Sequence, residues 1–157
     1  MVSDQGAGPQ IAAKVRLALL QLAQEAHQGH AFVCSDNPQD YAGALADFQR
    51  KTAPWRALPA KPEISEDAYR NRLLAEDALK NHDLNGAALY YEAGIASDPT
   101  WAQGWYNVAL VYAELKNFID ASDCMKHYVV LMPDAPDARA AKDNIILWEA
   151  KAPQPPR

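Results

Sequence analysis

The sequence predicts an all-α protein, built as a short right-handed stack of helical hairpins with a helical segment in front of it. The first observation is a self-similarity with a period of 34 residues across positions 68–135. The second is composition: 49% of the chain is aliphatic or aromatic, alanine carries much of that share, and alternating Val, Ile and Thr are nearly absent. A repeat of this length indicates a unit that buries its apolar face by stacking on a neighbour. Alanine favours closely packed helices over strands.

The repeat aligns small residues with small ones, large apolar residues mostly with large apolar ones, and proline with proline. The aligned pairs are Asn71 and Trp105, Leu74 and Val108, Ala75 and Ala109, Ala78 and Tyr112, Leu84 and Phe118, Ala87 and Ala121, Tyr91 and Met125, and Pro99 and Pro133. We expect the four aligned alanines at 75, 87, 109 and 121 to lie where two helices approach closely. The aromatic residues Tyr91, Trp105 and Tyr112 are expected to fill the spaces between successive helices.

Start and stop signals divide the chain into parts. The predicted parts are a disordered lead (1–9), an N-terminal two-helix segment (10–52), a proline-rich linker (53–64), a repeat domain (65–151) and a tail (152–157). Within the repeat domain, the units cover about 68–101 and 102–135, and a capping helix covers 136–151. The linker is predicted from Pro54, Pro59 and Pro62, which restrict the backbone.

The N-terminal segment is predicted to hold helices over 11–27 and about 39–51. Residues 31–34 between them form either an apolar loop, which we favour, or a short strand. The second helix places Tyr41, Ala44 and Phe48 at the same spacing as Leu84, Ala87 and Tyr91. This segment is therefore either a degenerate repeat or an amphipathic helix whose spacing agrees by coincidence.

Five helices are predicted in the repeat domain. They cover about 65–81, 85–97, 102–115, 118–131 and 136–151. Ser65 followed by two acids is a strong helix start, and Thr100 to Gln103 reads as a capping box. Pro136 is expected in the first turn of the last helix. We expect Trp55 and Leu58 of the linker to pack on a neighbouring helix.

The last helix is expected to close the stack with a polar outer face. That face is Arg139, Lys142, Asp143 and Glu149, opposite Ile145, Ile146 and Trp148. The end of such a stack needs polar side chains because no further repeat covers it.

The pattern Trp105, Val108, Ala109, Tyr112, Ala121 and Pro133 resembles a tetratricopeptide (TPR) repeat. The first unit resembles it through Leu74, Ala75, Ala87, Tyr91 and Pro99, and departs from it at Asn71, Ala78 and Gly94, as the second unit does at Tyr128. The resemblance covers residues 68–135, and 136–151 is similar to the helix that closes such arrays. It implies a groove, lined by the first helix of each pair, that takes a peptide or a partner helix.

Carried over by register, the resemblance implies a partner-binding groove formed by two helices. Its residues are Tyr69, Arg72, Glu76, Leu79 and Lys80 from the first, and Gln103, Tyr106, Asn107, Leu110 and Glu114 from the second. The aromatic and leucine side chains would supply contact area, Arg72 a partner for a carboxylate, and Asn107 hydrogen bonds to a peptide backbone.

One subtype of the family is excluded by charge. Arg72 and Asn107 match two positions of the clamp that grips the acidic tails of chaperones, but Glu76, Asp137 and Ala141 stand where other clamp residues belong. Two acids in a carboxylate clamp would repel its ligand. The acidic groove edge suits a peptide with basic or neutral polar side chains instead.

Charge and composition exclude further classes of function. Residues 65–150 hold fourteen acids against seven bases, so we expect no nucleic-acid partner. The chain has no run of 18 apolar residues and no secretory signal, so no membrane span is predicted and a cytoplasmic location is favoured. The two cysteines are expected to be free thiols.

No metal, cofactor or catalytic site is predicted. His27, His30, Cys34 and Asp36 lack the second ligand pair of a zinc motif, and Cys124 with His127 reads as a structural pair on one helix. We therefore expect a non-catalytic protein-interaction module. The alternatives are a self-associating unit, such as a homodimer, whose groove is filled by its own N-terminal segment or another copy, and an enzyme accessory region that uses the Cys34 loop.

Overall fold

The computed structural model describes residues 41–153, and these residues form six α-helices and no strand. The helices are α2 (Tyr41–Arg56), α3 (Glu66–Lys80), α4 (Leu84–Ser97), α5 (Ala102–Glu114), α6 (Phe118–Leu131) and α7 (Ala138–Lys151). The predicted all-α class is therefore confirmed. The expected lead, the helix at 11–27, the segment 30–38 and the last residues of the tail lie outside the described residues.

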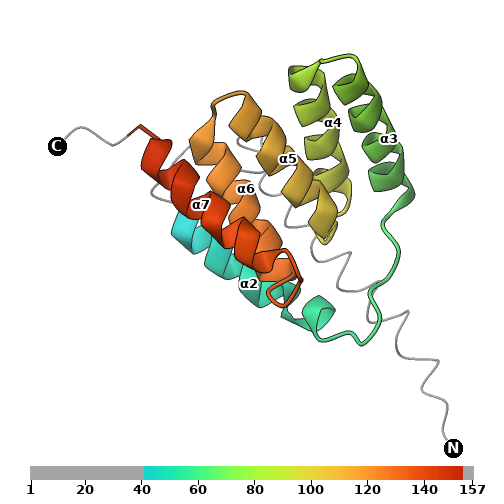
Figure 1. Cartoon of the computed structure of the whole chain (residues 1–157). Helices are drawn as coiled ribbons and strands as arrows, with labels where there is room; N and C mark the ends of the chain where they lie inside the picture. The colour runs from blue at the N-terminus through green and yellow to red at the C-terminus, as the bar shows by residue number, and fades with distance from the viewer. Residues whose placement is uncertain (1–40, 154–157) are drawn as a thin grey trace, which may run out of the picture.

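Helices α3 to α7 stack side by side in chain order, each packed on the next (Figure 1). The hairpins α3–α4 and α5–α6 are the closest pairs, and α7 closes the stack against α6. The four alanines at 75, 87, 109 and 121 are fully buried, and Tyr91, Trp105 and Tyr112 fill the core between helices. These packing predictions are confirmed.

The 34-residue period recurs in the backbone. The tight turns of both hairpins contain a residue with positive φ, His82 (58°) and Lys116 (63°), which are 34 positions apart. The residues that follow them, Asp83 and Asn117, cap α4 and α6 by accepting the backbone N–H of Gly86 and Asp120. Equivalent chemistry at equivalent positions gives the two hairpins the same geometry.

The start of α3 is as predicted, but that of α5 is not. Ser65 caps α3 by accepting the backbone N–H of Ala68, with Glu66 and Asp67 in the first turn. The capping box at 100–103 is wrong: Trp101 takes the N-cap position and makes no side-chain cap bond. Thr100 instead donates its hydroxyl to Asp98 Oδ1 at 2.7 Å, so the hydroxyl is used to fix the turn before the helix.

The predicted linker begins too early. Helix α2 continues through Pro54 to Arg56, because Phe48, Thr52 and Trp55 bury one face of it in the core. A side chain also hydrogen-bonds the backbone just before the proline, since the hydroxyl of Thr52 donates to the carbonyl of Phe48 at 2.8 Å. Packing and these bonds outweigh the helix-breaking effect of one proline.

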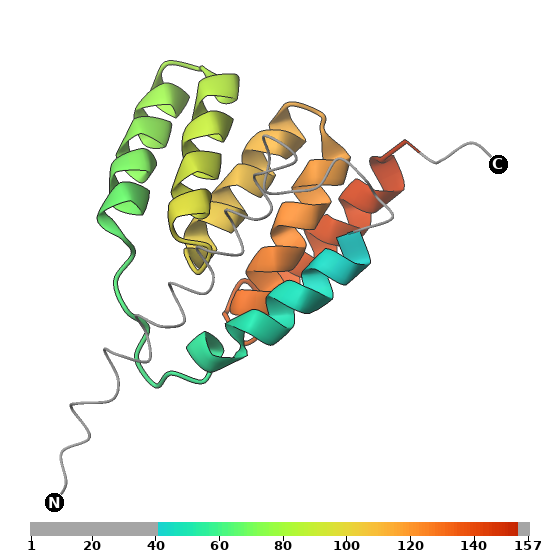
Figure 2. The ribbon, with the colours of Figure 1, turned by 180° about the vertical axis from the view of Figure 1, so that it is seen from behind.

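Helix α2 lies against α6, on the side of the stack that faces the viewer in Figure 2. The ring of Phe48 packs edge-on against the ring of Trp105, with centroids 5.6 Å apart, and its centroid lies 4.8 Å from that of His127. Ala44 is exposed, unlike the buried alanines of the repeats. This helix therefore does not occupy the place in front of α3 that a degenerate repeat would take.

The last helix differs from its prediction in two respects. It begins at Ala138, after a turn in which the N–H of Ala138 bonds the carbonyl of Ala135, so Pro136 lies before the helix. Arg139, Lys142, Asp143 and Glu149 are exposed and Trp148 is buried, as expected. Ile146, however, is 64% exposed and Leu147 is 55% exposed. The inward stripe is Ala138, Ala141, Ile145 and Trp148, which leaves Ile146 on the outer side.

Candidate functional site

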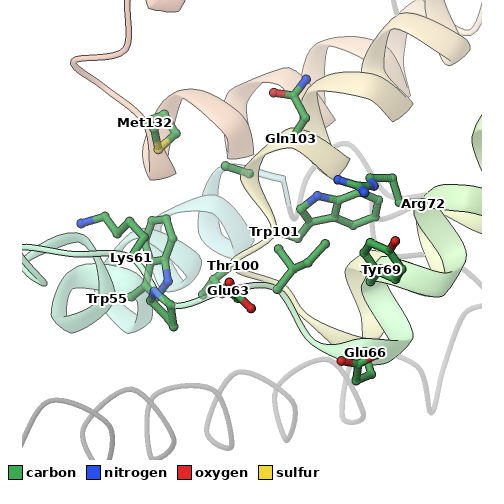
Figure 3. Close-up of a pocket in the computed structure, with 13 residues that line it drawn as sticks. Trp55, Lys61, Glu63, Glu66, Tyr69, Arg72, Thr100, Trp101, Gln103 and Met132 are labelled. Atoms are coloured by element: carbon green, nitrogen blue, oxygen red, sulfur yellow. The ribbon is translucent and has the colours of Figure 1, made fainter.

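Two hollows lie along the face shared by α3 and α5. The first, which we name the connector hollow, has a volume of about 630 Å³ and lies beside the connector that leads from α2 into α3 (Figure 3). Its walls are Trp55, Lys61, Pro62, Glu63, Ile64, Glu66, Tyr69, Arg72, Thr100, Trp101, Ala102, Gln103 and Met132. The second, the acidic hollow, has a volume of about 380 Å³ and is lined by Glu76, Leu79, Leu84, Tyr91, Asn107, Leu110, Val111 and Glu114.

Eight of the ten groove residues expected from the sequence line these hollows. The connector hollow takes Tyr69, Arg72 and Gln103, and the acidic hollow takes Glu76, Leu79, Asn107, Leu110 and Glu114. Lys80 is exposed at the end of α3 and lines neither hollow. Residues three and four apart on a helix share one face, and the place of each residue along α3 or α5 decides which hollow it lines.

Tyr106, the tenth expected groove residue, contacts α6 and lines neither hollow. It is half-buried and packs edge-on against Tyr128 of α6, with ring centroids 5.0 Å apart. The alanine usual at position 128 in the resembled pattern would leave this face of α5 free. The larger Tyr128 offers a ring to Tyr106 and draws it into the α5–α6 contact, so Tyr106 lines neither hollow.

The walls of the connector hollow come from parts of the chain that are distant in sequence. The guanidinium of Arg72 lies 4.9 Å from the ring centre of Tyr69 on α3, and Lys61 Nζ lies 5.0 Å from the ring centre of Trp55 on α2. Between them, Trp101 packs against Tyr91 with centroids 5.9 Å apart. The hollow therefore combines aromatic surface with cationic and acidic side chains at its edge.

The acidic hollow has an apolar floor and carboxylates on its rim. Glu76 and Glu114 are exposed on α3 and α5, and Leu110 between them is 39% exposed. Burial raises the pKa of the Tyr91 hydroxyl, and the negative charge of Glu76 raises it further, while a side-chain hydrogen bond with Asn107 acts in the opposite direction. Asn107 also accepts a hydrogen bond from Gln103 Nε2 at 2.9 Å, so its amide is held in a fixed position.

Sequence reasoning did not select Trp55, Lys61 or Trp101 as site residues. The first two lie outside the repeat register, and Trp101 was assigned to a capping box. The available signal was two tryptophans next to prolines, Trp55 after Pro54 and Trp101 two residues after Pro99. Only the packing of α2 beside the stack brings Trp55 near α3 and α5.

Helix α2 packs on α6, and among its residues Trp55 lines the connector hollow and none lines the acidic hollow. Neither hollow is filled by these residues. Residues 10–40 of the predicted N-terminal segment lie outside the described residues, so covering of the groove by that segment stays a prediction.

Helix α6 carries a buried polar group under α2. The ring of His127 stacks on Trp105 at 4.2 Å and its Nδ1 lies 2.8 Å from the carbonyl oxygen of Asp123. Cys124 beside it is fully buried. Within residues 41–153, no three His, Cys, Asp or Glu side chains lie close enough to hold a metal ion. His27, His30, Cys34 and Asp36 lie outside this range.

None of the helices in the described range is both long and apolar enough to cross a lipid bilayer. A scan against protein-family models finds no family that matches this chain, and a search of curated proteins finds no match either. The assignment of function therefore depends on the two hollows and their chemistry.

Proposed function

We propose that this protein is a non-catalytic interaction module of the TPR type, which binds a peptide or partner helix along the α3–α5 face. Residues 65–151 would form the array, with two repeats and α7 as the closing helix. The observation that carries the proposal is the pair of hollows on one face, lined by eight residues that the repeat register points to.

The repeated geometry supports the assignment to the TPR type. Turns, caps and buried alanines recur at intervals of 34 residues in the two hairpins. Stacked hairpins of this period form extended surfaces that bind other chains. Among the described residues, α2 lies on α6 and not over the surface between α3 and α5.

The chemistry of the acidic hollow favours one kind of ligand there. An apolar side chain of the partner would contact Leu79 and Leu110, and neighbouring Lys or Arg residues would lie near Glu76 and Glu114. Opposite charges on the two surfaces increase the association rate and the specificity. A segment with an apolar residue flanked by basic ones is therefore the proposed ligand.

The test is a pull-down with wild-type chain and two matched variants. Leu110→Glu places a charge in the acidic hollow, whereas Leu89→Glu places one on α4, where Leu89 is 65% exposed and lines neither hollow. Both sites are exposed, so neither variant is expected to lose its fold. The proposal is supported if Leu89→Glu captures as much partner as the wild type and Leu110→Glu captures at least tenfold less.

A partner that binds both variants equally well would place the interaction on another surface. The same purified samples serve for light scattering, which tests the rival proposal of self-association. The exposed pair Ile146 and Leu147 on α7 favours that rival. A stable dimer that Leu110→Glu dissociates would assign the α3–α5 face to a second copy instead of a partner.

A further inference from the structure

Three buried side-chain donors have no acceptor among the described residues. They are Trp55 Nε1, Arg56 Nε and Arg72 Nε. Trp55 and Arg72 line the connector hollow, and Arg56 lines an adjoining hollow that shares Lys61 and Met132 with it. Buried polar groups are nearly always hydrogen-bonded in native proteins, so three unpaired donors in one region indicate a place where acceptors are missing.

The surroundings of Trp55 Nε1 and Arg72 Nε show why neither donor is hydrogen-bonded. Trp55 is only 5% exposed, and its indole nitrogen is closed off from solvent. Arg72 Nε lies 3.8 Å from Glu76 Oε1, which is too long for a hydrogen bond. In the described part of the chain, no buried side-chain acceptor is similarly unpaired. The hollow can therefore offer donors to a ligand but has no spare buried acceptor.

The charges at the hollow select against a strongly charged ligand. Lys61 and Arg72 are balanced by Glu63 and Glu66 among the lining residues. The remaining surface is largely aromatic and apolar, with Trp55, Tyr69 and Trp101 on different elements (Figure 3). A neutral ligand that carries several acceptors and apolar rings fits this lining.

We propose that the connector hollow binds a proline-rich, extended segment of a partner protein. A proline residue brings a backbone carbonyl and an apolar ring but no N–H, so it demands no acceptor from the hollow. In the polyproline II conformation the carbonyls have no internal partners, and aromatic-lined grooves recognise such segments. Carbonyls of the segment would accept from Trp55 Nε1 and Arg72 Nε, and its rings would pack on Tyr69, which is 46% exposed.

Lys61 is the side chain that must move when the segment binds. It covers the ring of Trp55, and its ammonium donates to the carbonyls of Arg56 at 2.9 Å and Leu58 at 2.7 Å. Lys61 is exposed, so its displacement costs little packing. The ligand then takes the place of the lysine over the indole.

The inference rests on the proposed function, because it names one class of partner segment, but it uses a different hollow. The test is isothermal titration of the full chain with a decaproline peptide, with a glycine–serine peptide of equal length as the control. Binding of decaproline but not of the control is expected. Trp55→Phe keeps an aromatic ring and removes the N–H, so its affinity should fall by about five- to tenfold.

Trp148→Phe is the matched variant, since Trp148 is a buried tryptophan on α7 that lines neither hollow. It should bind decaproline like the wild type. Circular dichroism should show the same helix content in both variants. No binding of decaproline at millimolar concentration, equal binding of the control peptide, or an unchanged affinity in Trp55→Phe would each overturn the inference.

The two proposals fail separately. Leu110→Glu acts on the acidic hollow and should leave decaproline binding unchanged. A partner that depends on Leu110 in the pull-down, together with no decaproline binding, would remove only the inference about proline-rich segments. If the chain binds decaproline but captures no partner that depends on Leu110, only the proposal for the acidic hollow is refuted.

Discussion

Replacing Gly104 by alanine tests the packing between the two hairpins. Gly104 lies in the first turn of α5, where the side chain of Trp101 folds back over it. A methyl group at Gly104 would lie 2.6 Å from Trp101 Cδ2 and 2.8 Å from Cζ3, and closer still to Cε3. The indole cannot move away easily, because on its other side it touches Gly94 of α4, where a methyl group would lie 2.6 Å from Cζ3.

Two opposing terms set the size of the effect. Alanine is favoured over glycine in a helix by up to about 1 kcal/mol. Overpacking a well-filled core costs roughly 1–3 kcal/mol, and contacts shorter than 3 Å with a buried ring place Gly104→Ala in the upper part of that range. We expect a net loss of about 1–2 kcal/mol, which lowers Tm by about 2–8 °C in a protein of this size.

Gly43→Ala is the matched control, because no atom of residues 41–153 lies within 4 Å of a methyl group at this position in α2. It should leave stability unchanged or raise it by up to about 1 kcal/mol. Thermal melts followed by circular dichroism measure both variants. If Gly104→Ala melted at or above the wild-type temperature, the close contact of Trp101 with α4 and α5 would be refuted.

Two further predictions concern stability. Burial, followed by the charge of Asp120, raises the pKa of Glu92 from 4.5 to about 8. Because this carboxyl binds its proton more tightly in the folded state, the contribution of Glu92 to stability is fully present below pH 4.5 and is lost as the pH rises toward 8. Glu92→Gln should flatten this fall in urea-unfolding series at pH 5 and 8, and an equally steep fall in the variant would assign it to other groups. His82→Gly should raise Tm by about 2–4 °C, since φ is 58° at this turn and glycine adopts it without steric cost; a lower Tm would show that the histidine side chain stabilises the turn.

Where the repeat helices begin and end could mostly be predicted from local sequence. Helix α6 has the predicted bounds, 118–131, because the asparagine before it caps it and a proline follows it closely. Ser65 caps α3 for the same local reason. The register of the resembled repeat pointed to Glu76, Leu79 and Leu110, and all three line the acidic hollow.

Other features depended on contacts between distant residues. The hydroxyl of Thr100 had two possible uses, and the position of Asp98 decided between them. Tyr106 packs against Tyr128, 22 residues later, and lines neither hollow. Pro54 stays inside a helix because α2 buries one face against α6.

By itself, the sequence determined the helical class, the 34-residue hairpin unit and the face on which the repeat residues gather. These follow from periodicity, small residues and caps, which act over a few residues along the chain. The tertiary structure alone decided that α2 packs on α6 and brings Trp55 beside Tyr69 and Trp101. The connector hollow therefore arises from the packing of segments that no local pattern relates, and burial of the apolar face of α2 is the physical reason that it exists.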